Sequence, residues 1–152
     1  MAIRIIAIGK KHESWVAEGI DRYQKRLKRP FTVEWVLLPH SAREGHAARV
    51  EESERILSRI KPEEFVVLLD ERGKLLDSPA LSQALLSPLE TSQTIVIVIG
   101  GAYGVDQTVH SSVDLVWSLS RLVFPHQLVR LILAEQLYRA QEIAAGNPYH
   151  HS

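Results

Sequence analysis

The amino-acid sequence predicts an α/β fold, with a mainly parallel sheet and helices on both of its faces. One observation behind this is that short apolar runs, typical of strands, alternate three times with longer stretches of helical spacing. A second is that these runs lack the polar alternation of strands that have one side in water. With 152 residues, of which 45% are hydrophobic, we expect one domain that covers residues 1–152 and has one core.

A change of spacing marks the first strand and the first helix. The isoleucine-rich run Ala2–Ile8 is too short for a helix and ends at Gly9, which predicts a buried strand. From Ser14 onward apolar residues recur every three or four positions, which predicts an amphipathic helix to about Arg29, ended by Pro30.

The opposite side of this predicted helix is basic. Its positively charged residues follow one another at steps of three, one and three: Arg22, Lys25, Arg26 and Arg29. Two interpretations stay open, a solvated helix face or a strip that contacts phosphates, because spacing alone does not distinguish them.

The middle of the chain repeats the pattern of strand and helix twice. Phe31–Leu38 predicts a second strand, and the apolar spacing of residues 47–60 predicts a second helix. A charged run is expected on the solvent side of that helix: Glu51, Glu52, Glu54 and Arg55. Phe65–Leu69 predicts a third strand that stops at Asp70, and the pair Ser78-Pro79 predicts the start of a third helix that reaches Leu86.

The last third of the chain is where we expect a ligand site. Ile95–Ile99 predicts a buried strand that leads into Gly100–Gly104, and no residue from Thr91 to Val105 is charged. A further predicted strand, Asp114–Leu119, is followed by a loop and by a helix that starts near His126. Ligands of open α/β sheets bind where strands end in loops, so these two strands should deliver their loops to one site.

The glycine loop limits what that site can hold. A dinucleotide fingerprint needs glycine at its first, third and sixth positions, but counted from Gly100 the third is Ala102 and the sixth is Val105. A phosphate-binding P-loop needs a lysine, and none follows Lys74. A bulky ligand without phosphate, such as an adenine nucleoside with a sulfonium, stays compatible. Asp70, at a strand end, either accepts from ribose hydroxyls or forms a turn.

The last helix is well marked at both ends, by Pro125 and by Gly146. Its apolar residues spread over more than one side, and its polar stripe is narrow. A helix with two apolar sides needs two surfaces to bury it. We therefore expect the sheet on one side and a second copy on the other, a homodimer, in preference to a central buried helix.

Composition narrows the class of protein. The 18 basic and 18 acidic residues cancel, so the overall field does not favour nucleic acid. Cysteine is absent and the seven histidines show no metal-binding spacing, so we expect no metal site. The apolar run at the start, Ile3–Ile8, is too short for a membrane span or a signal peptide, and we expect a cytoplasmic protein.

The tail after the last helix, Asn147–Ser152, contains a tyrosine and two histidines. Such a tail is either frayed, or it supplies side chains that stack on a base and move a proton near neutral pH.

Short motifs run through the whole chain in a fixed order. They are Ala7-x-Gly9-Lys10, Leu68-Leu69-Asp70, Ile99-Gly100-Gly101-x-x-Gly104, Trp117-Ser118-Leu119-Ser120, Pro125-His126-x-Leu128-Val129-Arg130, Ala134-Glu135-x-Leu137-Tyr138-Arg139-Ala140 and Pro148-Tyr149-His150. In their order and spacing, and in its length, the chain resembles the RlmH-type ribosomal RNA methyltransferases of the SPOUT superfamily.

This resemblance implies an enzyme that transfers a methyl group from S-adenosylmethionine to N3 of a pseudouridine in large-subunit (23S) ribosomal RNA. It implies a homodimer, a C-terminal trefoil knot and a substrate presented on assembled ribosomal particles. Two alternatives stay open: a methyltransferase of the same fold that acts on another RNA base, and a non-catalytic ribosome-binding module.

The resemblance also implies site residues. Those that bind the cofactor are Leu69, Gly100, Leu119, Ser120, Arg121, Leu122, Val123 and Phe124. On the acceptor side, the catalytic candidates are His150 and Tyr149, and the RNA-binding candidates are Arg139 and the basic residues Arg22, Lys25, Arg26 and Arg29. No metal is needed. Ala102 and Tyr103 stand where some relatives have Pro-Glu, so no catalytic role is assigned there.

Overall fold

The predicted α/β fold with a parallel sheet is confirmed by the computed structural model, which describes residues 2–151. All five strands are parallel and lie in the order β2-β1-β4-β3-β5. The strands are β1 (Ile3–Ile8), β2 (Val33–Leu38), β3 (Phe65–Leu75), β4 (Ile95–Ile99) and β5 (Leu115–Ser118). The helices are α1 (Ser14–Gln24), α2 (Gly45–Leu57), α3 (Ser78–Glu90), α4 (Gln107–His110) and α5 (His126–Ala144).

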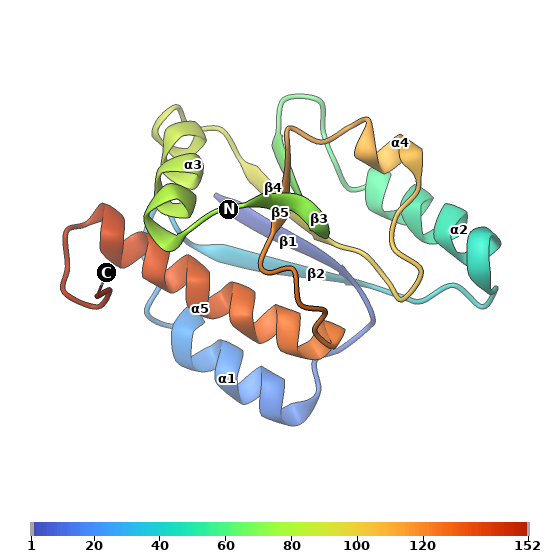
Figure 1. The fold of residues 1–152 in the computed structure, drawn as a ribbon, viewed down its shortest axis with the longest axis horizontal. Coiled ribbons are helices and arrows are strands. Elements are labelled where there is room, and N and C mark those ends of the chain that lie inside the picture. Colours follow the sequence, from blue (N-terminus) through green and yellow to red (C-terminus); the bar gives the residue numbers. More distant parts are fainter. Residues whose placement is uncertain (1, 152) are drawn as a thin grey trace.

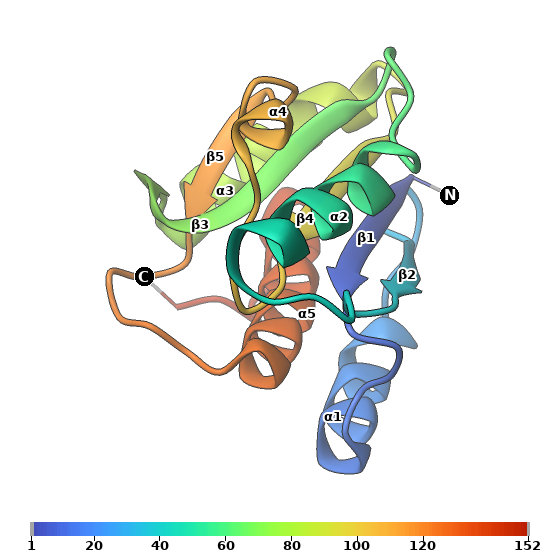
Figure 2. The same ribbon diagram turned by 90° about the vertical axis from the view of Figure 1, so that its right-hand side faces the viewer.

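Helices cover both faces of the sheet, as predicted (Figures 1 and 2). Strand side chains alternate between the faces. Ile3, Ile5 and Ala7 of β1 pack with α3 and α5, whereas Ile6 and Ile8 pack with α2 and α4. Helix α1 lies outside α5 and is joined to it by a smaller buried cluster. The core is therefore divided by the sheet into two layers.

Helix α1 ends at Gln24, so the prediction of a helix that reaches Arg29 was wrong. After Gln24 the backbone tightens, and the N–H of Arg26 and of Leu27 each donate to the carbonyl three residues earlier. Side-chain bonds from α5 then hold the segment: Gln141 accepts from the N–H of Lys28 at 2.6 Å and donates to the carbonyl of Arg26 at 3.1 Å. These tertiary bonds replace the last helical turn, which sequence periodicity does not reveal.

Strand β3 is longer than predicted and does not stop at Leu69. Its pairing with β5 resumes after an interruption, since Trp117 is opposite both Leu69 and Lys74. Residues 70–73 therefore bulge out of the ladder. A Cβ at Gly73 would lie 2.7 Å from the backbone of Val116, so only glycine fits there. Asp70 is the first residue of this bulge.

Helix ends differ from the sequence expectations by small steps. Asp77, not Ser78, caps α3 by accepting from the N–H of Ala80 at 2.9 Å, and the helix continues past Leu86 to Glu90. The short helix α4, capped by Asp106, was not predicted. At the end of α5, Gly146 has a φ of +73°, and it and Asn147 donate to carbonyls of the last turn, so the predicted glycine stop is confirmed.

One interpretation of α2 was wrong. Glu52 was expected on its solvent side, but only 3% of this residue is exposed, and the neighbouring Ser53 is fully buried. The reason is that α2 packs not only on the sheet but also beside the segment between β4 and α4. Among the charged residues of α2, the Glu52 carboxylate is thus buried.

Helix α5 has α1 on one flank and α3 on the other, so contacts within one chain cover part of the apolar surface that suggested a second copy (Figure 1). Within residues 2–151 no helix combines the length and the hydropathy needed to cross a membrane.

Candidate functional site

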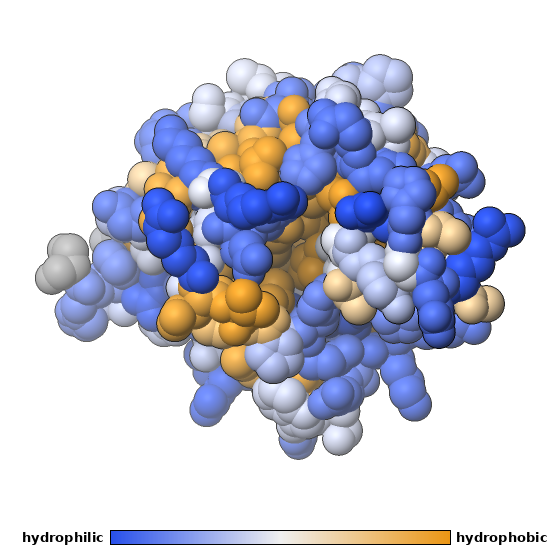
Figure 3. All heavy atoms as spheres, turned by 45° about the vertical axis from the view of Figure 1, so that its right-hand side comes forward, coloured by the Kyte–Doolittle hydropathy of each residue, from blue (hydrophilic) through white to orange (hydrophobic). Residues whose placement is uncertain are grey.

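A cavity of about 420 Å³ opens beyond the ends of β4 and β5 and beside the bulge of β3. Three segments that lie far apart in sequence surround it: residues 68–72, the glycine loop at residues 99–105, and residues 119–129. This is the place that the strand ends predicted. In the space-filling view of Figure 3, hydrophobic residues line a hollow that hydrophilic side chains border.

Most of the residues predicted to bind a cofactor meet in this cavity. Seven of the eight line it: Leu69, Gly100, Leu119, Ser120, Leu122, Val123 and Phe124. The eighth, Arg121, is exposed and is not among the lining residues that the structure describes. The structure therefore brings these side chains together, and their role as ligands of a cofactor stays a prediction.

The glycine loop forms one wall of the cavity as a tight turn. The N–H of Gly104 donates to the carbonyl of Gly101 at 3.0 Å, and Gly104 has a φ of +73°, which favours glycine. Gly101 has a different reason for lacking a side chain, because a Cβ there would overlap with Oε1 of Glu52. This wall presents backbone and no charged side chain to the cavity.

The opposite wall is the loop between β5 and α5. It is braced by its own side chains, since Ser118 Oγ donates to the carbonyl of Ser120 at 2.8 Å and the N–H of Leu122 donates to Ser120 Oγ at 3.0 Å. Leu122 and Val123 nevertheless are 70% and 78% exposed. Two adjacent apolar side chains this exposed at a cavity mouth favour a bound ligand or partner over them.

Asp70 lines the cavity and also forms a turn. Its carboxylate accepts from the backbone N–H of Arg72 at 2.9 Å and from two guanidinium nitrogens of Arg72 at 3.2 and 2.9 Å. His110 Nε2 lies 3.8 Å from the same carboxylate. These hydrogen bonds from Arg72 lower the pKa of Asp70 despite its partial burial. Asp70 is therefore a charged acceptor at neutral pH.

The C-terminal tail packs on α5 rather than fraying. The Tyr149 hydroxyl donates to Glu135 at 3.0 Å, and the guanidinium of Arg139 lies 4.9 Å from the centre of the Tyr149 ring. Arg139 Nη1 is 3.0 Å from Nδ1 of His150. Desolvation and the Glu135 carboxylate raise the pKa of Tyr149 to about 12. Tyr149 is thus a neutral phenol under ordinary conditions.

The tail and the cavity are neighbours but not one site. His150 lines a second cavity, of about 460 Å³, and Leu119 borders both cavities. The predicted catalytic residues Tyr149 and His150 and the RNA-binding candidate Arg139 are therefore together. Of the residues predicted to bind the cofactor, only Leu119 borders the cavity that His150 lines.

The four basic residues do not form one helix stripe. Arg22 lies in the last turn of α1 and Lys25 caps it, whereas Arg26 and Arg29 lie in the turn that follows. All four are exposed, and they lie near the C-terminal part of α5, because Gln141 binds the backbone of Arg26 and Lys28. Since α5 has 19 residues and is about 28 Å long, they lie far from the cavity at its N-terminal end.

The chain is similar to known proteins along its whole length. A family model described as a predicted SPOUT methyltransferase matches residues 1–150. The chain belongs to this family. A protein named ribosomal RNA large subunit methyltransferase H, from Synechococcus sp. (strain RCC307), is 45% identical over 150 residues, which are 99% of this chain and 95% of that one. The protein of the same name from Geobacter metallireducens is 42% identical over the full length of both chains.

A more distant similarity is to a solved structure, that of the SpoU methyltransferase AviRb from Streptomyces viridochromogenes in complex with AdoMet. It has a TM-score of 0.47 and 12% identity, over 93% of this chain and 58% of that chain. The SPOUT methyltransferase described here thus spans little more than half of that protein.

Sequence reasoning missed several lining residues of this SPOUT methyltransferase. His126, the first residue of α5, is the one imidazole among the described residues that line the cavity, and Val105 and Val129 add apolar surface. The predicted helix start at His126, next to a predicted site loop, was the signal that would have found it. Among residues 2–151, no three His, Asp or Glu side chains are grouped so that they could hold a metal ion.

Proposed function

We propose that this SPOUT methyltransferase transfers a methyl group from S-adenosylmethionine to N3 of a pseudouridine in 23S ribosomal RNA, in the cytoplasm and on assembled ribosomal particles. The observation that carries the proposal is the meeting of seven predicted cofactor residues around one cavity. It is supported by relatives of nearly equal length that are named for methylation of large-subunit ribosomal RNA.

The residues of the cavity fit this cofactor. S-adenosylmethionine, when bound, supplies a methyl group on a positively charged sulfur. The cavity has a volume typical of sites for small molecules, with apolar walls from Leu69, Leu119 and Phe124 and a glycine backbone that lets a flat ring approach closely. Asp70 adds a carboxylate that can accept from hydroxyl groups. The one arginine among the described lining residues, Arg72, is paired with the Asp70 carboxylate.

The tail serves the acceptor base in this proposal. Tyr149 cannot act as a proton acceptor near neutral pH, because its pKa is raised to about 12, but its ring can hold a base by stacking. A neutral His150 has its lone pair on Nδ1 toward the Arg139 guanidinium and its proton on Nε2. His150 therefore accepts the N3 proton only once substrate binding displaces Arg139, which is free to bind RNA phosphate instead.

The assembly and the RNA contacts complete the proposal. We propose a homodimer, a C-terminal segment threaded as a trefoil knot and one domain over residues 1–152. Arg22, Lys25, Arg26 and Arg29 form a basic docking surface for ribosomal RNA phosphates. Because the chain has no net charge, binding depends on the shape of the particle as well as on phosphates.

The test combines binding with product mapping. Calorimetry with S-adenosylmethionine should give one site per chain, and incubation with large ribosomal particles should place a methyl group on N3 of one pseudouridine, located by mass spectrometry. Free ribosomal RNA should be a much poorer substrate. Methylation of a different base would move the enzyme to another substrate of the same family, and a protein that binds no cofactor would be a binding module.

A further inference from the structure

Two neighbouring buried residues of α2, Glu52 and Ser53, face the glycine loop from outside the cavity. Glu52 is 3% exposed and Ser53 is fully buried. Neither is among the described residues that line the cavity. They are two adjacent buried polar residues in a helix segment whose charged pattern predicted solvent exposure of Glu52.

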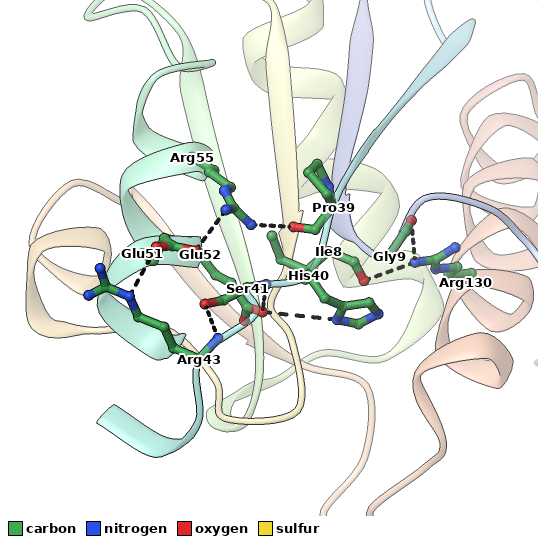
Figure 4. Close-up of polar contacts among 10 residues, drawn as sticks. All are labelled: Ile8, Gly9, Pro39, His40, Ser41, Arg43, Glu51, Glu52, Arg55 and Arg130. Atoms are coloured by element: carbon green, nitrogen blue, oxygen red, sulfur yellow. Dashed lines mark hydrogen bonds and ion pairs between the residues drawn. The ribbon is translucent and has the colours of Figure 1, made fainter. Parts of the chain in front are cut away.

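Glu52 touches the start of the loop. Its Oε1 occupies the space that a side chain at Gly101 would need. Its Oε2 accepts from the backbone N–H of Ser41 at 2.9 Å and lies 3.9 Å from Nδ1 of His40. Figure 4 shows the carboxylate directed from α2 toward the segment after β2, where Ser41 and His40 lie. One carboxylate thus joins α2, that segment and the glycine loop.

Ser53 touches the end of the same loop. Its Oγ accepts from the backbone N–H of Asp106 at 3.0 Å. Asp106 in turn caps α4 by accepting from the N–H of Thr108 and of Val109. Two successive residues of α2 therefore contact the two ends of the loop, at Gly101 and Asp106, which are five residues apart in sequence.

This arrangement is costly for stability alone. Oε1 of Glu52 has no hydrogen-bond partner among residues 2–151, and a buried carboxylate oxygen without a partner is unfavourable. A pair of apolar residues would fill the same space without that cost. The compensation we see is geometric, because the carboxylate fixes where the backbone of Gly101 can lie.

We propose that Glu52 and Ser53 are positioning residues of the cofactor site: they set the shape of the glycine loop from behind and so determine cofactor affinity without touching the cofactor. This inference rests on the proposed function. It is distinct from it, because the cavity residues were assigned from the sequence, whereas Glu52 and Ser53 are assigned from packing alone.

The contact between Glu52 and Gly101 provides the test. Gly101 does not have a positive φ, so an alanine there is opposed by space and not by backbone conformation. In Gly101→Ala the new methyl group meets the carboxylate, and in Glu52→Ala the loop loses its support. In the double variant the methyl group occupies part of the vacated space, and the remaining close neighbour is Ile8 Cγ2, at 3.2 Å.

The measurement is S-adenosylmethionine affinity by calorimetry, with thermal unfolding of the cofactor-free proteins beside it. Each single variant should lose affinity by about tenfold and the double variant should regain most of that loss, since coupled contacts show interaction energies of this size. The matched control is Glu54→Ala, an exposed glutamate on the same helix, which should bind as the wild type does. Ser53→Ala removes one hydrogen bond and should weaken binding several-fold, against Ser58→Ala as its exposed control.

The outcomes separate this inference from the proposed function. A wild-type protein without affinity for S-adenosylmethionine overturns both. If the wild type binds but the folded Glu52→Ala and Gly101→Ala variants bind equally well, or their effects simply add, the positioning role is refuted and the proposed function stands. A role in stability only would lower the unfolding temperature and leave affinity unchanged. If Glu52→Ala does not fold, Gly101→Ala and Ser53→Ala decide alone.

Discussion

Arg130 of α5 is the largest fully buried side chain, and its replacement tests how a lone buried cation is tolerated. Its guanidinium donates to the carbonyls of Ile8, Gly9 and Lys11, at 3.1, 3.2 and 3.1 Å. No carboxylate among residues 2–151 forms a salt bridge with it. Desolvation by burial lowers its pKa. The planar fork of the side chain joins the loop after β1 to the first turns of α5 (Figure 4).

We expect Arg130→Met to destabilise the protein by about 2–4 kcal/mol. Three carbonyls lose a donor at roughly 1 kcal/mol each, more for bonds to a charged donor, while removal of the buried charge offsets part of the loss. Arg130→Lys should be no better, although it keeps the charge. An ammonium on a single stem cannot reach three carbonyls in the geometry of a guanidinium, so the desolvation cost stays and the bonds are lost.

Urea unfolding followed by circular dichroism measures both variants, with Arg59→Met as a control at an exposed arginine. A total stability of about 5–15 kcal/mol leaves the variants folded enough to measure. If Arg130→Lys were as stable as the wild type, charge rather than the three-way fork would be what the site requires. If Arg130→Met were as stable, the carbonyls would be satisfied by water and the reasoning would fail.

Three further predictions concern the tail and the basic surface. Deletion of residues 149–152 should abolish methylation of ribosomal particles but leave S-adenosylmethionine affinity near normal, because no described tail residue lines the cavity; full turnover by the truncated protein would refute this. Replacing Arg22 and Arg26 together by Glu should impair methylation of particles without changing cofactor affinity, whereas Arg59→Glu should have little effect. Each lost phosphate contact should lower by about 1 the slope of the logarithm of RNA affinity against the logarithm of salt concentration. Normal methylation by the double variant at physiological salt would show that these residues form a solvated surface. The raised pKa of Tyr149 favours the neutral phenol in the folded state, so its contribution to the free energy of unfolding is present below pH 10 and is lost as pH rises to about 12. Tyr149→Phe should not show this loss of stability between pH 10 and about 12. Identical unfolding profiles of the two proteins in that range would contradict the assignment.

Local signals in the sequence carried most of the fold. Wholly apolar runs such as Ile95–Ile99 are buried strands because both faces of the sheet are covered, and the glycine after α5 ends that helix through its own backbone conformation. The cavity was predicted for the same reason, since strand ends converge wherever the strands are parallel. These features depend on residues close to one another in sequence.

The wrong predictions concern features that depend on partners far away in sequence. Helix α1 ends early because Gln141 binds the turn after it, and β3 continues past Asp70 because β5 resumes pairing with Lys74. Glu52 is buried because the segment between β4 and α4 packs against α2. None of these distant partners changes the periodicity of the segment that it contacts. The sequence pattern alone therefore predicts that the Glu52 carboxylate is solvated.

The order of the strands has a consequence for how the chain is made. Strand β1 is first in the sequence, yet one of its two neighbours is β4, and the cavity is closed only when residues 119–129 arrive. A nascent chain that ends before Ile95 has its first and third strands without the strand that lies between them. Such a chain exposes long apolar edges and lacks the third wall of the cavity. A ligand that binds only the finished fold then stabilises it by mass action, by about 2.7 kcal/mol at one hundred times its dissociation constant. The supply of that ligand therefore acts on the stability of completed chains as well as on their activity.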